Sequence, residues 1–190
     1  MIFRVFAPKI NRTASILLYG ANLGYLGEGM FGPFIALFTE KVGGDVLNIS
    51  WAAATYFLVT GFMMIVVGKL SDIYNKEGLM LIGVFMAPIF TFSYILVQSP
   101  AQLLLVQAGL GVASALSTPT WNSLYAKHED KRKSGFLWGL AGGEFQITSA
   151  IAIILGGIIL TNTSFEFLFM TMGTIQFTAA LYQLQILRKK

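Results

Sequence analysis

Two acidic residues, Glu28 and Glu144, lie within long apolar stretches of the sequence. If these stretches cross a bilayer, a charged carboxylate there is costly, so it should be protonated, face the protein interior or meet a cation. The same stretches contain no Lys, Arg or His that could pair with either acid. This favours a proton or a cationic ligand as the partner of the two carboxyl groups over a structural ion pair.

Glu28 ends a row of polar residues, because Asn22, Tyr25 and Glu28 follow one another at three-residue steps. On a helix such residues share one face, so these side chains could line a cavity that binds a substrate or a coupling ion. A neutral Glu28 that makes a structural hydrogen bond is the alternative. Three glycines on a different face of this helix are typical of a packing seam: Gly20, Gly24 and Gly27.

Glu144 lies on the helix face opposite the glycines of its own apolar stretch, beside Leu137, Leu140 and Ile151. That is an awkward position for a cavity acid. One interpretation is that Glu144 packs against another helix of the same subunit as a protonated hydrogen-bond donor. The other is a part in substrate binding or ion coupling.

A third set of polar residues follows a stripe roughly 100° wide on one helix, residues 101–125. Its members are Gln107, Gly111, Ser114, Thr118, Trp121, Asn122 and Tyr125. Gly, Ser and Thr also favour tight helix packing in lipid, which is the competing interpretation. The Gln, the Asn and the Trp on the same stripe favour the wall of a water-filled cavity that takes a small organic solute.

The residue types exclude several kinds of chemistry. The chain has no cysteine and one histidine, His128, which lies in a charged segment, so we predict no metal site. No nucleotide-binding Gly-Lys-Ser loop is present, and we predict no cofactor and no ATP drive. The apolar stretches hold no clear acid–base pair, so an enzyme is not expected. The net charge of +4 follows membrane topology and is not a nucleic-acid signal.

The elements that position these residues are predicted from composition and hydropathy. Hydrophobic residues make up 55% of the chain and charged residues 12%, which indicates a multi-pass protein of the cell (cytoplasmic) membrane. We expect an all-α membrane protein in one domain, residues 1–190, with six transmembrane helices. The predicted spans are approximately 13–38, 49–68, 79–98, 101–125, 134–161 and 165–187.

Basic residues then fall almost entirely on one side of the membrane. Lys41 lies on one side, and the other 12 of the 13 lysines and arginines share the opposite side. This bias predicts that both termini are cytoplasmic, which agrees with an even number of spans. The cytoplasmic set is Arg4, Lys9, Arg12, Lys69, Lys76, Lys127, Lys131, Arg132, Lys133, Arg188, Lys189 and Lys190.

The segment GKLSDIYNKEG, residues 68–78, is a charged stretch between two apolar runs. Gly68 allows a neighbouring helix to approach closely, and Asp72 could accept hydrogen bonds from the free N–H groups at a helix start. Lys76 could pair with Asp72 if the segment is helical. On these residues alone, an ordinary solvated loop is the simpler interpretation.

The pattern Gly68-x-Leu70-Ser71-Asp72 resembles the loop between helices 2 and 3 of the major facilitator superfamily. Ile73, Asn75 and Glu77 depart from that family's basic and glycine positions. Weaker resemblances lie in three further stretches: GEGMFGP (27–33), QAGLGVASALSTPTWNSL (107–124) and KRKSG (131–135). The resemblance implies a secondary transporter fold and gives Gly68, Asp72 and Lys76 a role in conformational change.

Two departures limit what the resemblance implies. Leu104 stands where proton-coupled drug exporters of the family carry an arginine, and Ala152-Ile153 precedes Gly156-Gly157 where they carry Gly-Pro. Drug–proton antiport by the usual motifs is therefore not expected. Full transporters of the family have twelve spans in two six-helix halves, and this chain is similar to one half.

Small residues at seven-residue steps predict where a second half would dock. One row lies on the second predicted helix, and another on the fifth, at spacings that allow close approach over a long length. The rows are Ala54, Gly61 and Gly68, and then Gly135, Gly142, Ser149 and Gly156. Packing within one six-helix bundle explains one such row easily.

We therefore expect a parallel homodimer in which helix 2 of each subunit meets helix 5 of the other. Asp72 would then approach Ser134 and Gly135 of the partner chain. The leading hypothesis is a half-length secondary transporter that works by alternating access, with facilitated diffusion or coupling to an ion gradient. The rivals are half of a heterodimeric transporter, and a non-transporting membrane scaffold, binding subunit or fragment of a longer gene.

Overall fold

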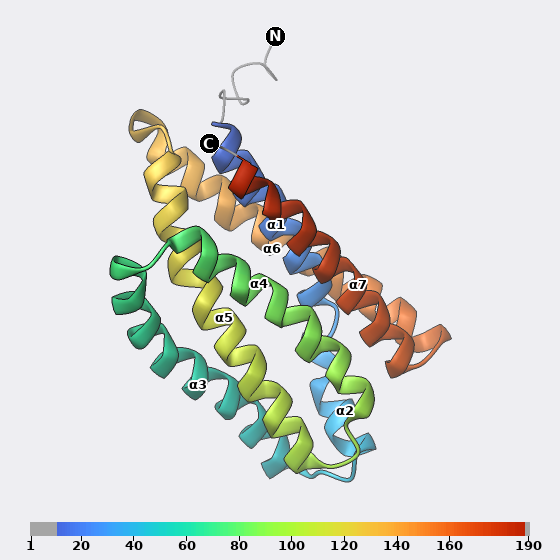
Figure 1. Ribbon diagram of the computed structural model, residues 1–190. Coiled ribbons are helices and arrows are strands. Elements are labelled where there is room, and N and C mark those ends of the chain that lie inside the picture. The colour runs from blue at the N-terminus through green and yellow to red at the C-terminus, as the bar shows by residue number, and fades with distance from the viewer. Residues whose placement is uncertain (1–10, 189–190) are drawn as a thin grey trace.

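A computed structural model describes residues 11–188, and every regular element within that range is a helix (Figure 1). Arg4, Lys9, Lys189 and Lys190 lie outside the described residues. The longer helices are α1 (Arg12–Gly29), α2 (Ile35–Lys41), α3 (Val46–Ile73), α4 (Lys76–Ser93), α5 (Pro100–His128), α6 (Ser134–Asn162) and α7 (Phe165–Gln183). Short 3₁₀ segments are η2 (Gly32–Phe34), η3 (Tyr94–Leu96), η4 (Lys131–Lys133) and η5 (Leu184–Arg188).

Polar residues between the apolar runs set where the helices begin. Asp45 and Asn48 form a capping box at the start of α3, in which each side chain bonds the backbone N–H of the other residue. Ser99 and Ser164 accept hydrogen bonds from backbone N–H groups in the first turns of α5 and α7. The predicted breaks at 99–100 and 162–164 are therefore helix boundaries in the structure.

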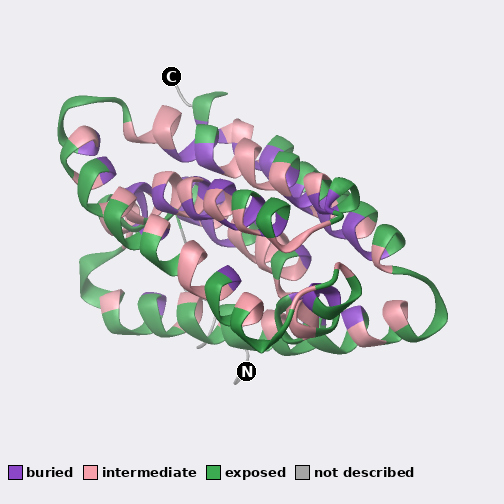
Figure 2. Cartoon of the chain, turned by 90° about the horizontal axis from the view of Figure 1, so that it is seen from below, coloured by how far each residue is buried: buried purple, intermediate pink, exposed green. Residues whose placement is uncertain are grey.

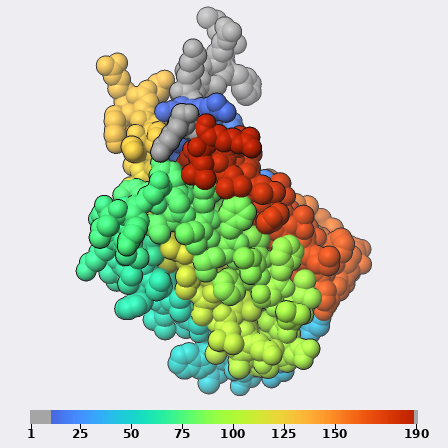
Figure 3. Space-filling view, in the orientation of Figure 1, coloured from blue at the N-terminus to red at the C-terminus, as the bar shows by residue number. Residues whose placement is uncertain are grey.

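The helices form an open ring. Going round it, α3 packs on α5, α5 on α4, α4 on α7, α7 on α1, and α1 on α6. Figure 1 shows α3 at the edge of the bundle beside α5, and Figure 3 shows α4 and α7 side by side on one face. Helices α3 and α6 are the two ends of the ring, so each has a neighbour mainly on one side.

Within residues 11–188, four helical segments are long and apolar enough to cross a membrane by length and composition. They are α3, α4 together with η3, α5, and η4 together with α6. Helix α3 runs on to Ile73, so Gly68 and Asp72 lie in its last turns and not in a loop as expected. The connection to α4 is only residues 74–75.

The first predicted span, 13–38, is divided in the structure. Helix α1 ends at Gly29, and the chain passes through η2, which contains Pro33, before α2 begins at Ile35. Proline has no N–H to donate to the preceding turn, so a break near Pro33 has an identifiable cause. The break brings the backbone of Met30 against Gly156 of α6.

Helices α1 and α7 meet through small residues on α1. A side chain at Gly20 or Gly27 would collide with Gln183 or Gln176 of α7. This places two of the three glycines of the predicted seam at a helix contact, whereas the space at Gly24 is open.

Two buried clusters fill the interior of the bundle. The first is rich in aromatic rings and lies where α2, η3 and α7 meet: Phe31, Phe38, Tyr94, Phe165 and Phe169. The second surrounds Leu17, Met80 and Tyr125. Figure 2 shows exposed residues over much of the outer helix surfaces. Helices α3 and α6 bury the smallest share of their apolar windows.

Candidate functional site

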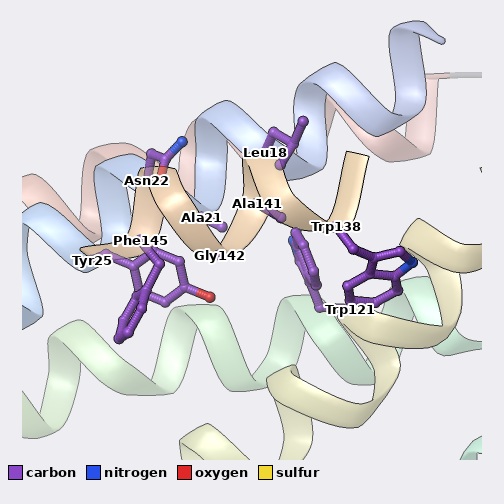
Figure 4. Close-up of a pocket in the computed structure, with 9 residues that line it drawn as sticks. All are labelled: Leu18, Ala21, Asn22, Tyr25, Trp121, Trp138, Ala141, Gly142 and Phe145. Carbon is purple, nitrogen blue, oxygen red and sulfur yellow. The ribbon is translucent and has the colours of Figure 1, made fainter. Parts of the chain in front are cut away.

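A pocket of about 210 Å³ lies between α1, α5 and α6 (Figure 4). Its lining is mostly apolar and consists of Leu18, Ala21, Asn22, Tyr25, Trp121, Trp138, Ala141, Gly142 and Phe145. Tyr25 and Phe145 make an edge-to-face contact, with ring centroids 4.7 Å apart. Trp121 and Trp138 lie next to each other at a different part of the pocket, with ring centroids 6.4 Å apart. The structure thus brings Asn22, Tyr25 and Trp121 of the predicted site into one pocket.

Glu144 lies against α1 and not alone on the outer surface of α6. The Nδ2 group of Asn22 donates a hydrogen bond to Oε2 of Glu144, and Asn22 also lines the pocket. The acid therefore packs against another helix of the same subunit, where its carboxyl group accepts the bond instead of donating it. This polar contact crosses the α1–α6 interface beside the aromatic lining.

Glu28 occupies the last turn of α1, just before the helix breaks, and its side chain is exposed in the isolated chain. The phenol groups of Tyr25, Tyr56 and Tyr94 lie close enough to interact electrostatically with its carboxyl group. The ion pairs among residues 11–188 do not include Glu28. The two acids are thus in different surroundings, Glu144 hydrogen-bonded at a helix contact and Glu28 exposed at the end of α1.

Tyr56 was not expected at the site. It comes from α3, and its hydroxyl lies near Ser114 of α5 and Thr60 of its own helix. The available signal was weak, because Thr55, Tyr56 and Thr60 are the few polar residues of a long apolar run. Ser114, predicted as a cavity residue, is therefore placed beside Tyr56 and not beside the aromatic pocket.

The predicted stripe on α5 does not form one wall. Gln107 is only 5% exposed, and its amide oxygen accepts a hydrogen bond from the Tyr94 hydroxyl at 3.1 Å. Trp121 donates from Nε1 to the backbone oxygen of Leu17 at 3.1 Å and stacks on Tyr125. The two ends of the stripe therefore contact different parts of the bundle, Gln107 contacting η3 and Trp121 contacting α1.

Thr118 and Asn122 are the exposed members of that stripe. They are four residues apart and so share one face of α5. Of the α5 residues predicted to bind a substrate, these two are the most open in the isolated chain, and Gln107 is excluded from a cavity wall by its burial.

Helix α3 ends in a charged turn that carries the exposed carboxylate of Asp72. The Asp72 side chain is 82% exposed, and its Oδ1 lies 3.7 Å from Nζ of Lys76. Lys76 also donates to the backbone oxygen of Ser71, which satisfies a carbonyl at the end of α3. The predicted Asp72–Lys76 pair forms across the turn between α3 and α4, with room for Asp72 to meet a further partner.

The row of small residues on α3 is open. Added side-chain atoms at Gly61 or Gly68 would meet nothing within 4 Å, and Ala54 is partly exposed. On α6, Gly135 and Gly142 are equally open. Ser134 is partly buried, and its hydroxyl donates to the Glu129 carboxylate at 3.1 Å.

The C-terminal residues of the α6 row, Ser149 and Gly156, were predicted to lie at a dimer interface but contact the chain's own backbone. Gly156 is buried, and a Cβ there would lie 2.8 Å from the carbonyl carbon of Met30. Ser149 is partly exposed, and its backbone lies beside Gly29, where an added Cβ would be 3.4 Å from the Cα of Ser149. The reason is the break in the first span, whose backbone occupies the groove that these residues form.

Among residues 11–188 no group of three or more metal-ligating side chains is present. The residues around the pocket offer hydrogen-bonding groups, aromatic faces and carboxyl groups.

A family model described as Major Facilitator Superfamily matches residues 17–188. The chain belongs to the major facilitator superfamily. Members of this superfamily are transporters. The apolar helices of this chain agree with a membrane protein. The resemblance on which the sequence analysis relied is thus confirmed over most of the chain.

Relatives within this superfamily are longer than this chain. An uncharacterised MFS-type transporter of Methanocaldococcus jannaschii is 28% identical over 91% of this chain and 45% of its own length. Multidrug resistance protein 3 of Bacillus subtilis is 24% identical over 83% of this chain and 31% of its own length. Multidrug resistance protein MdtG of Salmonella dublin is 23% identical over 87% of this chain and 42% of its own length. The chain spans less than half the length of these curated relatives.

Proposed function

We propose that this chain is a half-length secondary transporter that works as a parallel homodimer by alternating access. The observation that carries the proposal is the open ring of helices, whose two ends carry open glycines, Gly61 and Gly68 on α3 and Gly135 and Gly142 on α6. Six spans with cytoplasmic termini belong to this proposal. A second copy, related by an axis along the membrane normal, would place α3 of each subunit against α6 of the other.

The direction of the two helices supports this pairing. Helix α3 runs toward the Asp72 end of the bundle and α6 runs away from it, so Gly68 and Gly135 are the glycines of the two rows nearest that end. These two glycines and Gly61 and Gly142 are open in the isolated chain. Small residues on both sides let two helices approach closely, which is how helices associate in lipid.

The pocket size supports a cavity shared by two halves. About 210 Å³ is below the roughly 300–1,000 Å³ of most small-molecule sites. The pocket would be part of a larger cavity on the dimer axis, with Glu28, Thr118 and Asn122 of both subunits facing it. The proposed substrate is a small organic solute, and the carboxyl groups of Glu28 and Glu144 are the candidates for proton or cation coupling.

Asp72 would control the change between the two access states. In one state its exposed carboxylate would accept from the free N–H groups at the start of the partner's α6, and in the other it would return to Lys76. A different six-helix half could present the same helix start, which is the heterodimer alternative. A non-transporting scaffold or binding subunit is the third candidate.

Cysteine cross-linking tests the homodimer, because the chain has no cysteine of its own. Two differently tagged chains, one with Gly61→Cys and one with Gly142→Cys, would be expressed together and oxidised in the membrane. The proposal predicts a disulfide between the two tags. Met170→Cys, on the exposed face of α7, replaces Gly142→Cys in the control and should give none.

Transport in proteoliposomes tests the function itself. A screen of small organic solutes, with and without a pH gradient, would compare wild type with Glu28→Gln and Asn122→Ala. Flux that depends on the protein and falls in Glu28→Gln supports a coupled transporter. Flux that neither substitution changes would favour a scaffold or binding subunit.

A further inference from the structure

A second pocket, of about 300 Å³, lies at the end of the bundle opposite the start of α1 and the end of α7 (Figure 1). It is formed where α2, η3 and the first turn of α7 meet, away from the aromatic pocket and from the glycine rows. Its polar members are Lys41, Glu166 and Gln98, and its apolar members include Phe38, Ile95 and Phe169. Polar and apolar surface therefore meet in one cavity, as an amphiphile requires.

Lys41 and Glu166 form an ion pair, and both side chains still have exposed hydrogen-bonding groups. Nζ of Lys41 lies 2.8 Å from Oε1 of Glu166 and 5.3 Å from the centre of the Phe165 ring. The side chains are 48% and 51% exposed, respectively. An ammonium group has three donors and a carboxylate about four acceptor sites, so the Lys41–Glu166 bond and the bonds that Glu166 accepts from Ser164 and the backbone still leave sites on both groups. The pair offers a cationic and an anionic contact side by side.

An exposed apolar stripe on α7 leads away from this pair. Phe167, Met170, Phe177 and Leu181 are between 46% and 56% exposed and recur at helical spacing, so they share one face. Lys41 ends α2 and Glu166 lies in the first turn of α7, so if α7 crosses the membrane both charges lie at the level of the lipid headgroups. A ligand there would place its head at the pair and its chain along α7.

We propose that this pocket binds a zwitterionic aminophospholipid with a primary ammonium headgroup, of the phosphatidylethanolamine type. Its phosphate oxygens accept from the Lys41 ammonium, and its own ammonium donates to the Glu166 carboxylate. Its acyl chain lies on the exposed stripe of α7. A headgroup with quaternary nitrogen carries the same charges but has no N–H to donate, so hydrogen bonding distinguishes the two lipid classes. The proposal does not depend on dimer formation or transport.

Native mass spectrometry tests this directly. Delipidated protein would receive equal amounts of phosphatidylethanolamine and phosphatidylcholine of the same acyl composition, followed by the mono- and dimethylated ethanolamine lipids. We expect about fivefold preferential retention of phosphatidylethanolamine, which corresponds to the upper range of an exposed charge pair. Retention should fall as methyl groups replace N–H donors. Glu166→Gln should abolish the preference, and Lys41→Gln, which removes the phosphate contact common to both lipids, should lower the retention of both.

Matched variants at the other membrane surface, Lys69→Gln and Glu77→Gln, remove the same charges far from the pocket and should keep the preference. Equal retention of the two lipids by wild type would overturn the proposal. So would a preference that survives Glu166→Gln, or an unchanged retention of both lipids in Lys41→Gln. Displacement of the lipid by soluble glycerophosphoethanolamine at equal concentration would assign the pocket to a free headgroup compound and overturn the lipid assignment.

Discussion

Gly156 offers the sharpest test of the packing between α6 and the break in the first span. Substitution to alanine adds one carbon atom, which would lie 2.8 Å from the Met30 carbonyl carbon, 3.0 Å from its Cα and closer still to its oxygen. These neighbours are backbone atoms that cannot rotate aside, so α6 must move away from the break. Gly142 on the same helix is the matched control, because nothing lies within 4 Å of an added Cβ there.

The expected magnitude follows from two opposing effects. Overpacking of this kind typically costs about 1–3 kcal/mol, and contact with backbone places Gly156→Ala at the upper end. Replacing glycine by alanine in a helix interior returns up to about 1 kcal/mol at both positions. We therefore expect Gly156→Ala to lower the free energy of unfolding by about 2 kcal/mol. Gly142→Ala should leave it unchanged or raise it by up to about 1 kcal/mol.

Equilibrium unfolding by SDS in mixed micelles, followed by the helical circular dichroism signal, measures both values. The monomeric fraction would be used, so that loss of a partner chain does not contribute to the measured free energy. If Gly156→Ala unfolds at the wild-type SDS fraction, α6 does not pack on the break as described. The Gly156 position would then be available to a partner, as the sequence alone suggested.

Three further predictions concern polar contacts. Asn22→Leu should lower the free energy of unfolding by about 0.6–1.7 kcal/mol, the range of interhelical hydrogen bonds in membranes, whereas Glu144→Gln, which keeps an acceptor, should cost less; equal costs in the SDS titration would contradict the contact. Tyr94→Phe should cost about 1–3 kcal/mol in the same titration because the buried Gln107 amide loses its partner, and added Gln107→Leu should restore part of that loss. Asp72→Asn should change the unfolding free energy by less than about 0.5 kcal/mol, as for an exposed residue, yet lower the yield of the inter-chain disulfide; an unchanged yield would remove Asp72 from the interface.

Helix boundaries at capping residues could be predicted from the sequence, but the break in the first span could not. Ser99-Pro100 and Asn162 mark true ends because their polar groups satisfy free backbone groups. The break after Gly29 lies just before Pro33, which can end a helix but is also tolerated within transmembrane helices when neighbours satisfy the backbone, so its signal was ambiguous. Whether the helix continues through Pro33 depends on α6, which approaches only in the folded bundle.

Helical spacing predicted the site correctly only where the residues on one helix face also pack against the same neighbouring helix. Asn22 and Tyr25 are three residues apart, and the structure brings both to the pocket between α1 and α6. Gln107 and Trp121 lie fourteen positions apart on α5, and over that length the tilted helices bring different partners to the same face. A helical projection gives the face of a residue but not the neighbour that covers it.

The divided row on α6 bears on the shape of the proposed dimer. Its open glycines, Gly135 and Gly142, lie toward the Asp72 end of the bundle, whereas Gly156, toward the other end, is occupied by the chain's own backbone. Two copies could therefore approach closely at the Asp72 end while the occupied groove keeps α6 from a partner at the opposite end. A homodimer assembled from this conformation would be closed at the end that carries Asp72 and open at the end that carries Lys41. Closing the other end would require the break around Met30 to move off α6, which makes that contact the step on which alternating access would depend.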